Sequence, residues 1–551
     1  MRTYHTPGVY FEREDPPPLI GPLRTDIAGL IGIAERGPLH TPTKIESEAQ
    51  FASVFGGRIA QAYLAYAVDA FFANGGQTCW VVRIADPATA KTASLDIVDE
   101  VGNRVLGLKA GSPGTWGNRI VARWIVRDRD ILSITLHYPD GTEQLVRQPL
   151  QLVTSPTADT YDVTLGLVPD TFIPRLITFE RPDRGTPSPN HVSIDALTGM
   201  LAGGADGLAT LTRAHFTGDE TPAATPQGLK TLEQIDEVSI VAMPDVMPKL
   251  PIEPKKKRRP PHDCLNLNAP PSLPEFEEPP LEFPPPFQDP DIDAVYRALV
   301  AHCEKLRYRF AFLETRDGLL PELAIAARAQ SDSKYAAIYY PWVLVDDPLR
   351  LTGLARRVPP SGAVAGVFAR SDRRRGVHKP PANEVVEGAL DVGFDVDEIV
   401  HGVLNDADVN VLRAFPGRGI RVYGARTVAA DLLWRYVNVR RLVSMIEKAI
   451  DRGTQWTVFE PNAVPLWREI DRVVRAYLEA LFRQGMLDGA SSEEAYFVKC
   501  DEATNPPEAL EGRVVCRVGV QPPYPAEFVV IVIGKTQNAI EVLRETGAID
   551  A

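Results

Sequence analysis

The chain has 551 residues, 44% of them hydrophobic and 24% charged, and its formal net charge at pH 7 is −13. One hydrophobic core stops growing at about 250–300 residues, so this length predicts two to four domains. Nucleic-acid binders usually carry a basic stripe, and the acidic balance argues against that class of protein. The five scattered cysteines favour folding in a reducing cytoplasm without a disulfide framework.

The start of the chain predicts an extended arm over residues 1–22, because its prolines fix φ and remove backbone donors. The start has no apolar signal-peptide core. The apolar stretches at 335–345 and 528–533 fall short of the ~20 residues that span a bilayer. Neither a secretory signal nor direct membrane insertion is therefore expected.

Residues 23–86 are expected to form the N-terminal part of a core. Apolar runs at 25–34 and 79–84 predict two buried strands. Between them, Ser47 and Gln50 have the spacing of a capping box and open a helix through Phe51 and Phe55. The helical spacing continues from Tyr63 until Asn74-Gly75-Gly76 ends it.

The middle of the chain changes character twice. Residues 87–216 alternate in short runs separated by turn signals, which predicts an all-β insertion domain that faces outward. Residues 217–247 and 291–430 return to alternating strands and helices, with strands at 238–242, 310–313 and 335–345 and a helix at 292–307, which favours an α/β core. Residues 248–290 are rich in proline and charge and predict a solvated loop insertion.

The last part predicts an α+β domain over residues 431–522. It has apolar helical stripes at 439–450 and 467–482 and strands at 456–459, 496–500 and 514–520. Residues 523–551 follow as a C-terminal strand or arm. The predicted fold class is thus multidomain α+β and α/β, with a mixed-sheet core, an all-β insertion and extended N- and C-terminal arms.

The sequence motifs that mark nucleotide, metal and nucleophile sites are missing. There is no Walker A loop, H-E-x-x-H, C-x-x-C or G-x-S-x-G, and the glycine-rich stretch 203–207 has no lysine and predicts a turn. His262/Cys264 and His302/Cys303 make a poor zinc set, because Cys303 lies on an apolar helix face. Ser361-Gly362 suggests a tight turn. His378-Lys379 after the arginines 373–375 could hold an anion, although a solvated loop is the commoner reading. We therefore predict no enzyme activity, catalytic residue, cofactor or metal.

Several segments, in order along most of the chain, resemble those of the contractile tail sheath family. The resemblance is carried by TPGVY at 6–10, DIAGLIGIAERGP at 26–38, SPGTWGN at 112–118, VPPSG at 358–362, GVHKPPANE at 376–384, FPGRGIRVYGART at 415–427, RGTQW at 452–456 and FEPN at 459–462. Nothing is carried over onto residues 248–290, which look like an insertion. The resemblance fits sheaths of extracellular contractile injection systems at least as well as those of phages.

The resemblance implies a subunit that stacks in helical rings around an inner tube and contracts without a nucleotide. Its implied partners are further copies, the inner tube protein, and baseplate and terminator or cap proteins, with no nucleic acid. Assembly is expected in the cytoplasm, and the mature form in a phage tail or an injection particle that acts outside the cell.

Two segments are candidates for strand exchange between subunits, as terminal arms do in such sheaths. They are the N-terminal Pro7, Gly8, Val9, Tyr10 and Phe11 and the C-terminal Phe528, Val529, Val530, Ile531, Val532 and Ile533. The second is apolar on both faces and needs a partner strand, either from another chain or from its own domain. The arm could instead be disordered. Candidate tube contacts are Arg435, Arg440 and Arg441, with a solvated helix face as the alternative.

Three alternatives stay open. A minor or baseplate-proximal sheath paralogue would account for the proline-rich insertion. A surface or adhesion protein would suit an all-β insertion, and a nucleotide-handling enzyme would suit an α/β core. The sequence leaves open the helical symmetry, target, payload and trigger, and whether a phage or an injection system is the origin.

Overall fold

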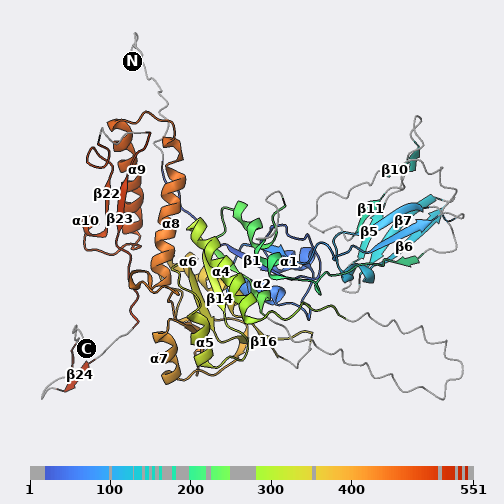
Figure 1. The fold of residues 1–551 in the computed structure, drawn as a ribbon, viewed down its shortest axis with the longest axis horizontal. Coiled ribbons are helices and arrows are strands. Elements are labelled where there is room, and N and C mark those ends of the chain that lie inside the picture. The colour runs from blue at the N-terminus through green and yellow to red at the C-terminus, as the bar shows by residue number, and fades with distance from the viewer. Residues whose placement is uncertain are drawn as a thin grey trace, which may run out of the picture. The chain divides into compact units, whose positions relative to one another are not determined.

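Figure 1 shows the chain as a computed structural model. The structure describes residues 19–98, 102, 104–127, 130–138, 143–147, 152–154, 161–163, 177–180, 198–218, 225–247, 281–349, 355–506, 512–527, 532–535 and 540–543. The chain forms two compact units. The larger consists of Arg24–Arg374 and Pro381–Val437, and the smaller of Met1–Leu23, Arg375–Pro380 and Asn438–Ala551.

The larger unit is built on a nine-stranded mixed sheet. Its six central strands are parallel, in the order β20 (Asn410–Phe415), β15 (Ala336–Tyr340), β14 (Phe310–Glu314), β13 (Ile240–Ala242), β1 (Ala28–Gly32) and β3 (Cys79–Arg83). Antiparallel strands flank them: β2 (Thr43–Ile45) at one end, and β21 (Gly419–Tyr423) and β18 (Glu384–Val385) at the other. β1, β13, β14 and β15 are buried at every residue, as expected for parallel strands covered on both faces.

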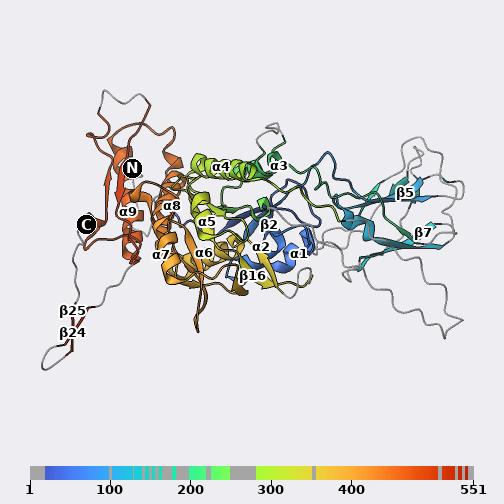
Figure 2. The same ribbon diagram turned by 60° about the horizontal axis from the view of Figure 1, so that its bottom comes forward.

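Helices cover both faces of this sheet (Figure 2). α1 (Glu48–Phe55) and α2 (Leu64–Ala73) connect β1 to β3, whereas α4 (Asp289–Leu306) and α5 (Pro321–Arg328) connect strands that run toward the other edge. Crossover connections between parallel strands are right-handed. The chain moves along the sheet in one direction from β1 to β3 and in the opposite direction from β13 to β14, so α2 and α4 lie on opposite faces. α6 (Ser361–Arg375) packs on α2, and α7 (Glu398–Asp406) lies beside α5. The unit also contains the short helices α3 (Arg213–Thr217), η2 (Gly228–Gln234), η3 (Pro244–Val246) and η4 (Leu432–Trp434). A small three-stranded sheet has the order β17 (Ala355–Val358), β16 (Val343–Asp346) and β19 (Ala389–Val392).

The start of α6 corrects one prediction. Ser361-Gly362 is not a tight turn but the first turn of this helix, where the Ser361 N–H donates to Glu314 Oε1 at 2.9 Å. A Cβ built on Gly362 would lie 2.3 Å from the Ala67 carbonyl oxygen, and one on Gly366 would lie 2.4 Å from that of Phe71. The two glycines therefore serve a close crossing of α6 over α2, a contact that no local pattern reveals.

In the described part of residues 87–216, which are predicted to be an all-β insertion domain, most elements are strands. One sheet consists of β11 (Ile177–Glu180), β5 (Arg104–Ala110) and β4 (Ser94–Val98). A second consists of β12 (Thr198–Met200), β6 (Val121–Arg127), β7 (Asp130–His137) and β8 (Glu143–Arg147). A pair β9 (Leu152–Thr154) and β10 (Tyr161–Val163) and the turn η1 (Thr115–Arg119) complete this region. It has its own hydrophobic cluster around Leu108, Trp116 and Ile134. Its last residues form α3 instead of a strand, and its outward position stays a prediction.

The smaller unit has helices α8 (Val437–Gly453), η5 (Gln455–Thr457), α9 (Val464–Arg483) and α10 (Ser492–Ala495). Its strands are β22 (Tyr496–Lys499), β23 (Arg517–Val520), β24 (Val532–Lys535) and β25 (Ile540–Leu543). Apolar side chains of α8 and α9, among them Leu442, Trp467 and Leu478, meet β22 in one hydrophobic cluster. This pairing of two stripes with a sheet is the predicted α+β arrangement.

Four local predictions need correction. The helix expected from Phe51 through Phe71 is two helices, because the chain turns at Gly56, whose φ is +84°. The strand at 335–345 is divided at Pro341 into β15 and β16. The segment 456–459 is not a strand, since 455–457 form the 3-10 turn η5. The strand at 514–520 begins only at Arg517. In the first two cases a turn that the apolar pattern does not encode interrupts the element.

Candidate assembly interface

The place where a nucleotide would bind in an α/β sheet of this order is filled by the chain itself. The strand order reverses between β1 and β13, and ligands of doubly wound folds lie at the carboxyl ends of such a pair. There the buried Asp245 carboxylate accepts the N–H groups of Ile33 at 2.8 Å, Tyr63 at 2.7 Å and Leu64 at 3.2 Å. A Cβ on Gly32 would lie 2.4 Å from Asp245 Oδ2, so no room is left. The carboxylate lies at the N-terminus of α2, the kind of position at which nucleotide-binding folds hold a phosphate.

The described candidates for a zinc site, His302 and Cys303, are buried residues that contact the protein itself. His302 Nε2 lies 2.7 Å from Arg309 Nη1, and burial together with this arginine lowers the pKa of His302 to about 3. Cys303 is fully buried in the main core, and His262 and Cys264 lie outside the described residues. Across the described ranges, no three His, Cys, Asp or Glu side chains are grouped so that they could hold a metal ion. No described helix is both long and apolar enough to cross a membrane.

The C-terminal candidate strand has a partner within the chain. Phe528–Ile531 lie outside the described residues, but Val532 and Ile533 begin β24, which pairs antiparallel with β25 from Val532↔Leu543 to Lys535↔Ile540. In the part of the chain that the structure describes, β24 and β25 pair only with each other. The N-terminal Pro7–Phe11 lie outside that part. Exchange of either segment between subunits stays a prediction.

A second pair of strands with open edges belongs to the body of the smaller unit. β22 and β23 pair antiparallel from Tyr496↔Val520 to Lys499↔Arg517, and neither has another partner among the described strands. One side of this sheet packs on α9, and Tyr496 and Val498 point into the cluster there. On the outer edge of β22 the Val498 carbonyl already accepts from Arg475 Nη2 at 2.9 Å, so the outer edge of β23 is the better place for an added strand.

The exposed side of α9 is covered by ion pairs. Arg472 Nε lies 3.0 Å from Glu469, Arg475 Nε 3.1 Å from Asp471, and Arg483 Nε 2.8 Å from Glu479. Most of these groups are solvated, so each pair adds little to stability. Their regular three- and four-residue spacing nevertheless gives this helix a face of alternating charge.

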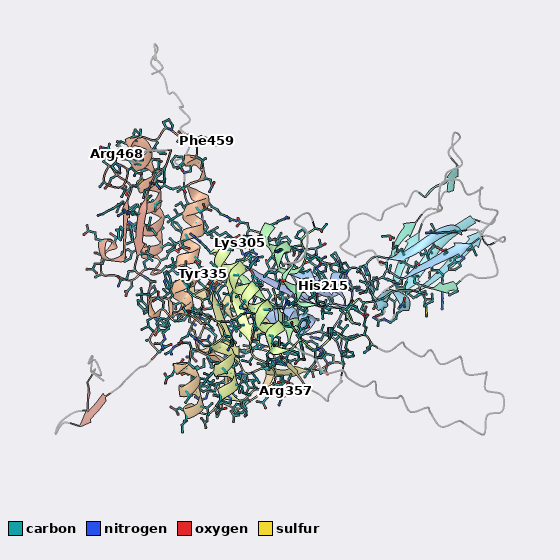
Figure 3. All side chains as sticks on the ribbon, viewed as in Figure 1. His215, Lys305, Tyr335, Arg357, Phe459 and Arg468 are labelled. Carbon is teal, nitrogen blue, oxygen red and sulfur yellow. The ribbon has the colours of Figure 1, made fainter. Side chains whose placement is uncertain are left out.

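An exposed aromatic side chain marks the loop between α8 and α9. Figure 3 labels Phe459 at the end of α8 and Arg468 near the start of α9. Phe459 is 102% exposed, its φ is +71°, and its neighbour Val458 is also exposed. A large apolar residue in left-handed backbone costs about 1–3 kcal/mol, and such strain concentrates at functional sites. Sequence reasoning placed this residue in a strand and missed it as a surface feature, although it is the first residue of the FEPN motif.

The three arginines predicted to contact the tube lie in different settings. Arg435 Nε lies 3.2 Å from Asp408, an acid that also binds Arg328 and Arg426. Arg440 is 1% exposed and donates to Ser444 and Glu447 at 3.1 and 2.9 Å, and Arg441 is 5% exposed. This burial does not suit direct contact by Arg440 or Arg441 with another protein. The tube contact stays a prediction, and the alternative of a solvated helix face is wrong for these two residues. The arginines 373–375, by contrast, are exposed at the end of α6.

The fold is one that solved sheath proteins share. The sheath of an extracellular contractile injection system, PVC, in the contracted state matches with a TM-score of 0.55 and 20% identity, covering 98% of this chain and 99% of that one. The helical sheath of the anti-feeding prophage in the contracted state matches with a TM-score of 0.54 and 21% identity, covering 97% and 100%. A sheath tail protein of Desulfitobacterium hafniense matches with a TM-score of 0.56 and 15% identity, covering 90% and 94%. The chain therefore has the multidomain α/β fold of tail sheath proteins.

Sequence relationships give the family. Residues 284–428 match the model of the phage tail sheath protein central domain, and residues 429–534 match that of the phage tail sheath C-terminal domain. A prophage protein of Pseudomonas aeruginosa (strain UCBPP-PA14) that carries the name of a major tail sheath protein is 29% identical over 198 residues. The tail sheath protein of Salmonella phage ViI is 26% identical over 204 residues. These matches span 35% and 36% of this chain but only 50% and 31% of the relatives. These matches place residues 284–534 of the chain in the tail sheath family.

Proposed function

We propose that this chain is the subunit of a contractile sheath, which polymerises helically around an inner tube and contracts to drive that tube through a target envelope. The observation that carries the proposal is the unbroken match of residues 284–534 to two successive sheath domains. The partners would be further copies of the chain, the inner tube protein, and baseplate and terminator or cap proteins. Assembly would take place in the cytoplasm, and the mature subunit would belong to a phage tail or an injection particle.

In this proposal the chain performs mechanical work and no chemical step. Contraction would be driven by the difference in interface free energy between an extended and a contracted packing of the same subunits. The Asp245 carboxylate in the crevice between β1 and β13 supports a role without a nucleotide, because it occupies the position where phosphates are bound in related folds.

Strand addition would join the subunits. The outer edges of β22 and β23 carry no further described strand, and the terminal segments Pro7–Phe11 and Phe528–Ile533 are apolar and long enough to pair with such an edge. Main-chain hydrogen bonds formed in this way would hold neighbours together while the globular units turn. Phe459 would add an apolar contact between subunits or with the tube.

The proposal can be tested by expressing the chain with its neighbouring tube protein and examining the product by negative-stain electron microscopy. Striated tubular particles, or short, wide and hollow ones, are the expected result. A variant that lacks residues 1–18 keeps every described element and should give unassembled subunits. Only monomers, unchanged after the tube protein is added, would contradict the proposal. They would favour the surface protein or the nucleotide-handling enzyme, and a thermal-shift screen with nucleotides would then separate these two.

A second candidate is a minor sheath paralogue close to the baseplate. The proline-rich segment 248–290, which resembles an insertion, favours it. The number of copies in purified particles distinguishes the two roles, because a major subunit is present in every ring whereas a minor one is limited to one or a few rings.

A further inference from the structure

Two cysteines of the smaller unit face each other across the β22–β23 sheet. The register runs from Tyr496↔Val520 to Lys499↔Arg517, so the next opposed pair along the sheet is Cys500 and Cys516. Neither is bonded to another cysteine in this structure. The two residues therefore lie opposite each other one position beyond the strand ends, although 15 residues separate them in the sequence.

The position of this pair in the ladder suits a covalent link. The Gln521 N–H donates to the Ala495 carbonyl at 2.8 Å, which makes 495 and 521 a hydrogen-bonded pair. Hydrogen-bonded and non-hydrogen-bonded pairs alternate along an antiparallel ladder, so Cys500 and Cys516 form a non-hydrogen-bonded pair. The Cα atoms of such pairs are about 4.5 Å apart, and disulfides need about 4.4–6.8 Å.

The loop between the two cysteines is folded so that they stay together. The buried Asn505 side chain accepts from the Val515 N–H at 2.6 Å and donates to the Val515 carbonyl at 3.0 Å. It also donates to the Asp501 carbonyl at 3.2 Å. One amide thus ties residue 501, next to Cys500, to residue 515, next to Cys516.

The two thiols perturb each other electrostatically. The interaction with Cys516 lowers the pKa of the Cys500 thiol, and the interaction with Cys500, together with burial, raises the pKa of Cys516. Cys500 is buried, but Cys516 is only partly buried and can be reached by small molecules. Cys79 and Cys303 differ, because both are fully buried in the other unit and burial raises the pKa of each thiol.

We propose that Cys500 and Cys516 are a redox modification site, at which a reversible cross-strand disulfide closes the loop 501–515. A low-molecular-weight disulfide, such as oxidised glutathione, is the oxidant. Its S–S bond breaks and it is reduced to two thiols, while the two cysteines lose two protons and two electrons and their S–S bond forms. The reaction passes through a mixed disulfide at one of the two sulfurs. Such a link constrains the unfolded chain and stabilises the unit that carries β22 and β23.

The time at which the link forms rests on the proposed function. In the reducing cytoplasm the pair would stay a dithiol while subunits assemble, and it would oxidise after the particle leaves the cell. The chemical proposal itself does not depend on assembly. The test uses unassembled chain. The disulfide proposal can therefore fail while the sheath proposal stands, and the sheath proposal can fail while the disulfide proposal stands.

The test uses the full-length chain with Cys264→Ser, because Cys264 lies outside the described residues. The protein is equilibrated in glutathione buffers from fully reducing to fully oxidising, quenched with acid, alkylated and digested without reductant for mass spectrometry. We expect one intrachain link between the peptides that carry Cys500 and Cys516, which disappears on reduction. The link should be lost in Cys500→Ser and in Cys516→Ser, and kept in the matched control Cys303→Ser.

A second measurement does not depend on the variants. The oxidised chain should melt at least about 5 °C above the reduced chain in the transition of the smaller unit. The double serine variant should melt at one temperature in both buffers. Full alkylation of both cysteines in oxidising buffer would overturn the proposal, as would a link from either of them to Cys79, Cys303 or a second chain. An intact link without any change in melting temperature would overturn the stabilising role.

Discussion

Replacing Asp245 should destabilise the larger unit more than any exposed acid would. In Asp245→Ala, three backbone donors, those of Ile33, Tyr63 and Leu64, lose a charged acceptor in a buried place. Hydrogen bonds to charged groups contribute about 1.5–3 kcal/mol each, and a buried donor left without a partner costs about 1–3 kcal/mol. Because three such bonds to one carboxylate are not additive, we expect a loss of about 3–6 kcal/mol in the free energy of unfolding.

Calorimetry of the unassembled chain at pH 7 measures this loss. At about 2–4 °C per kcal/mol, the transition of the larger unit should fall by roughly 10 °C or more in Asp245→Ala. Asp245→Asn should lose about half as much, since its amide keeps one acceptor oxygen but turns an NH2 group toward the donors. Asp346→Ala, at an exposed acid of β16, is the matched control and should change little. A shift in Asp245→Ala no larger than in this control would refute the account of the crevice as a satisfied structural site.

Three further outcomes are expected. In Phe459→Asn the left-handed backbone of this exposed position suits the new residue, so the melting temperature should hold while the yield of assembled particles falls roughly tenfold; full yield would rule out an interface role. Arg440→Ala should cost about 2 kcal/mol in urea unfolding, because it removes the hydrogen bonds of a buried guanidinium to Ser444 and Glu447; normal stability with lost tube binding would instead favour the tube contact. His302 has a folded pKa of about 3 against 6.5 when unfolded, so the unfolded chain binds more protons between these values and stability falls as pH drops through this window. The loss is roughly 2–3 kcal/mol at pH 4.5, and His302→Gln should remove it from the acid limb of the stability curve.

Much of the fold could be predicted because it is encoded by local periodicity. Apolar runs predicted β1, β3 and β14, and stripes of 3.6-residue period predicted α8 and α9 to within three residues of their ends. The capping residue Ser47 accepts from the Gln50 N–H, as its spacing predicts. The family could be predicted as well, because its motifs are short, ordered and spread along the chain.

The sequence by itself thus determined the order and type of most elements and the resemblance to tail sheath proteins. The tertiary structure decided which distant groups meet. Asp245 lies 181 or more residues from the backbone donors it satisfies, and Gly362 meets Ala67 only where α6 crosses α2. Cys500 and Cys516 become neighbours only through the register of β22 and β23. A periodic pattern reports which face of an element is buried, but the contact across that face depends on how two elements pack, and this information is not local in the chain.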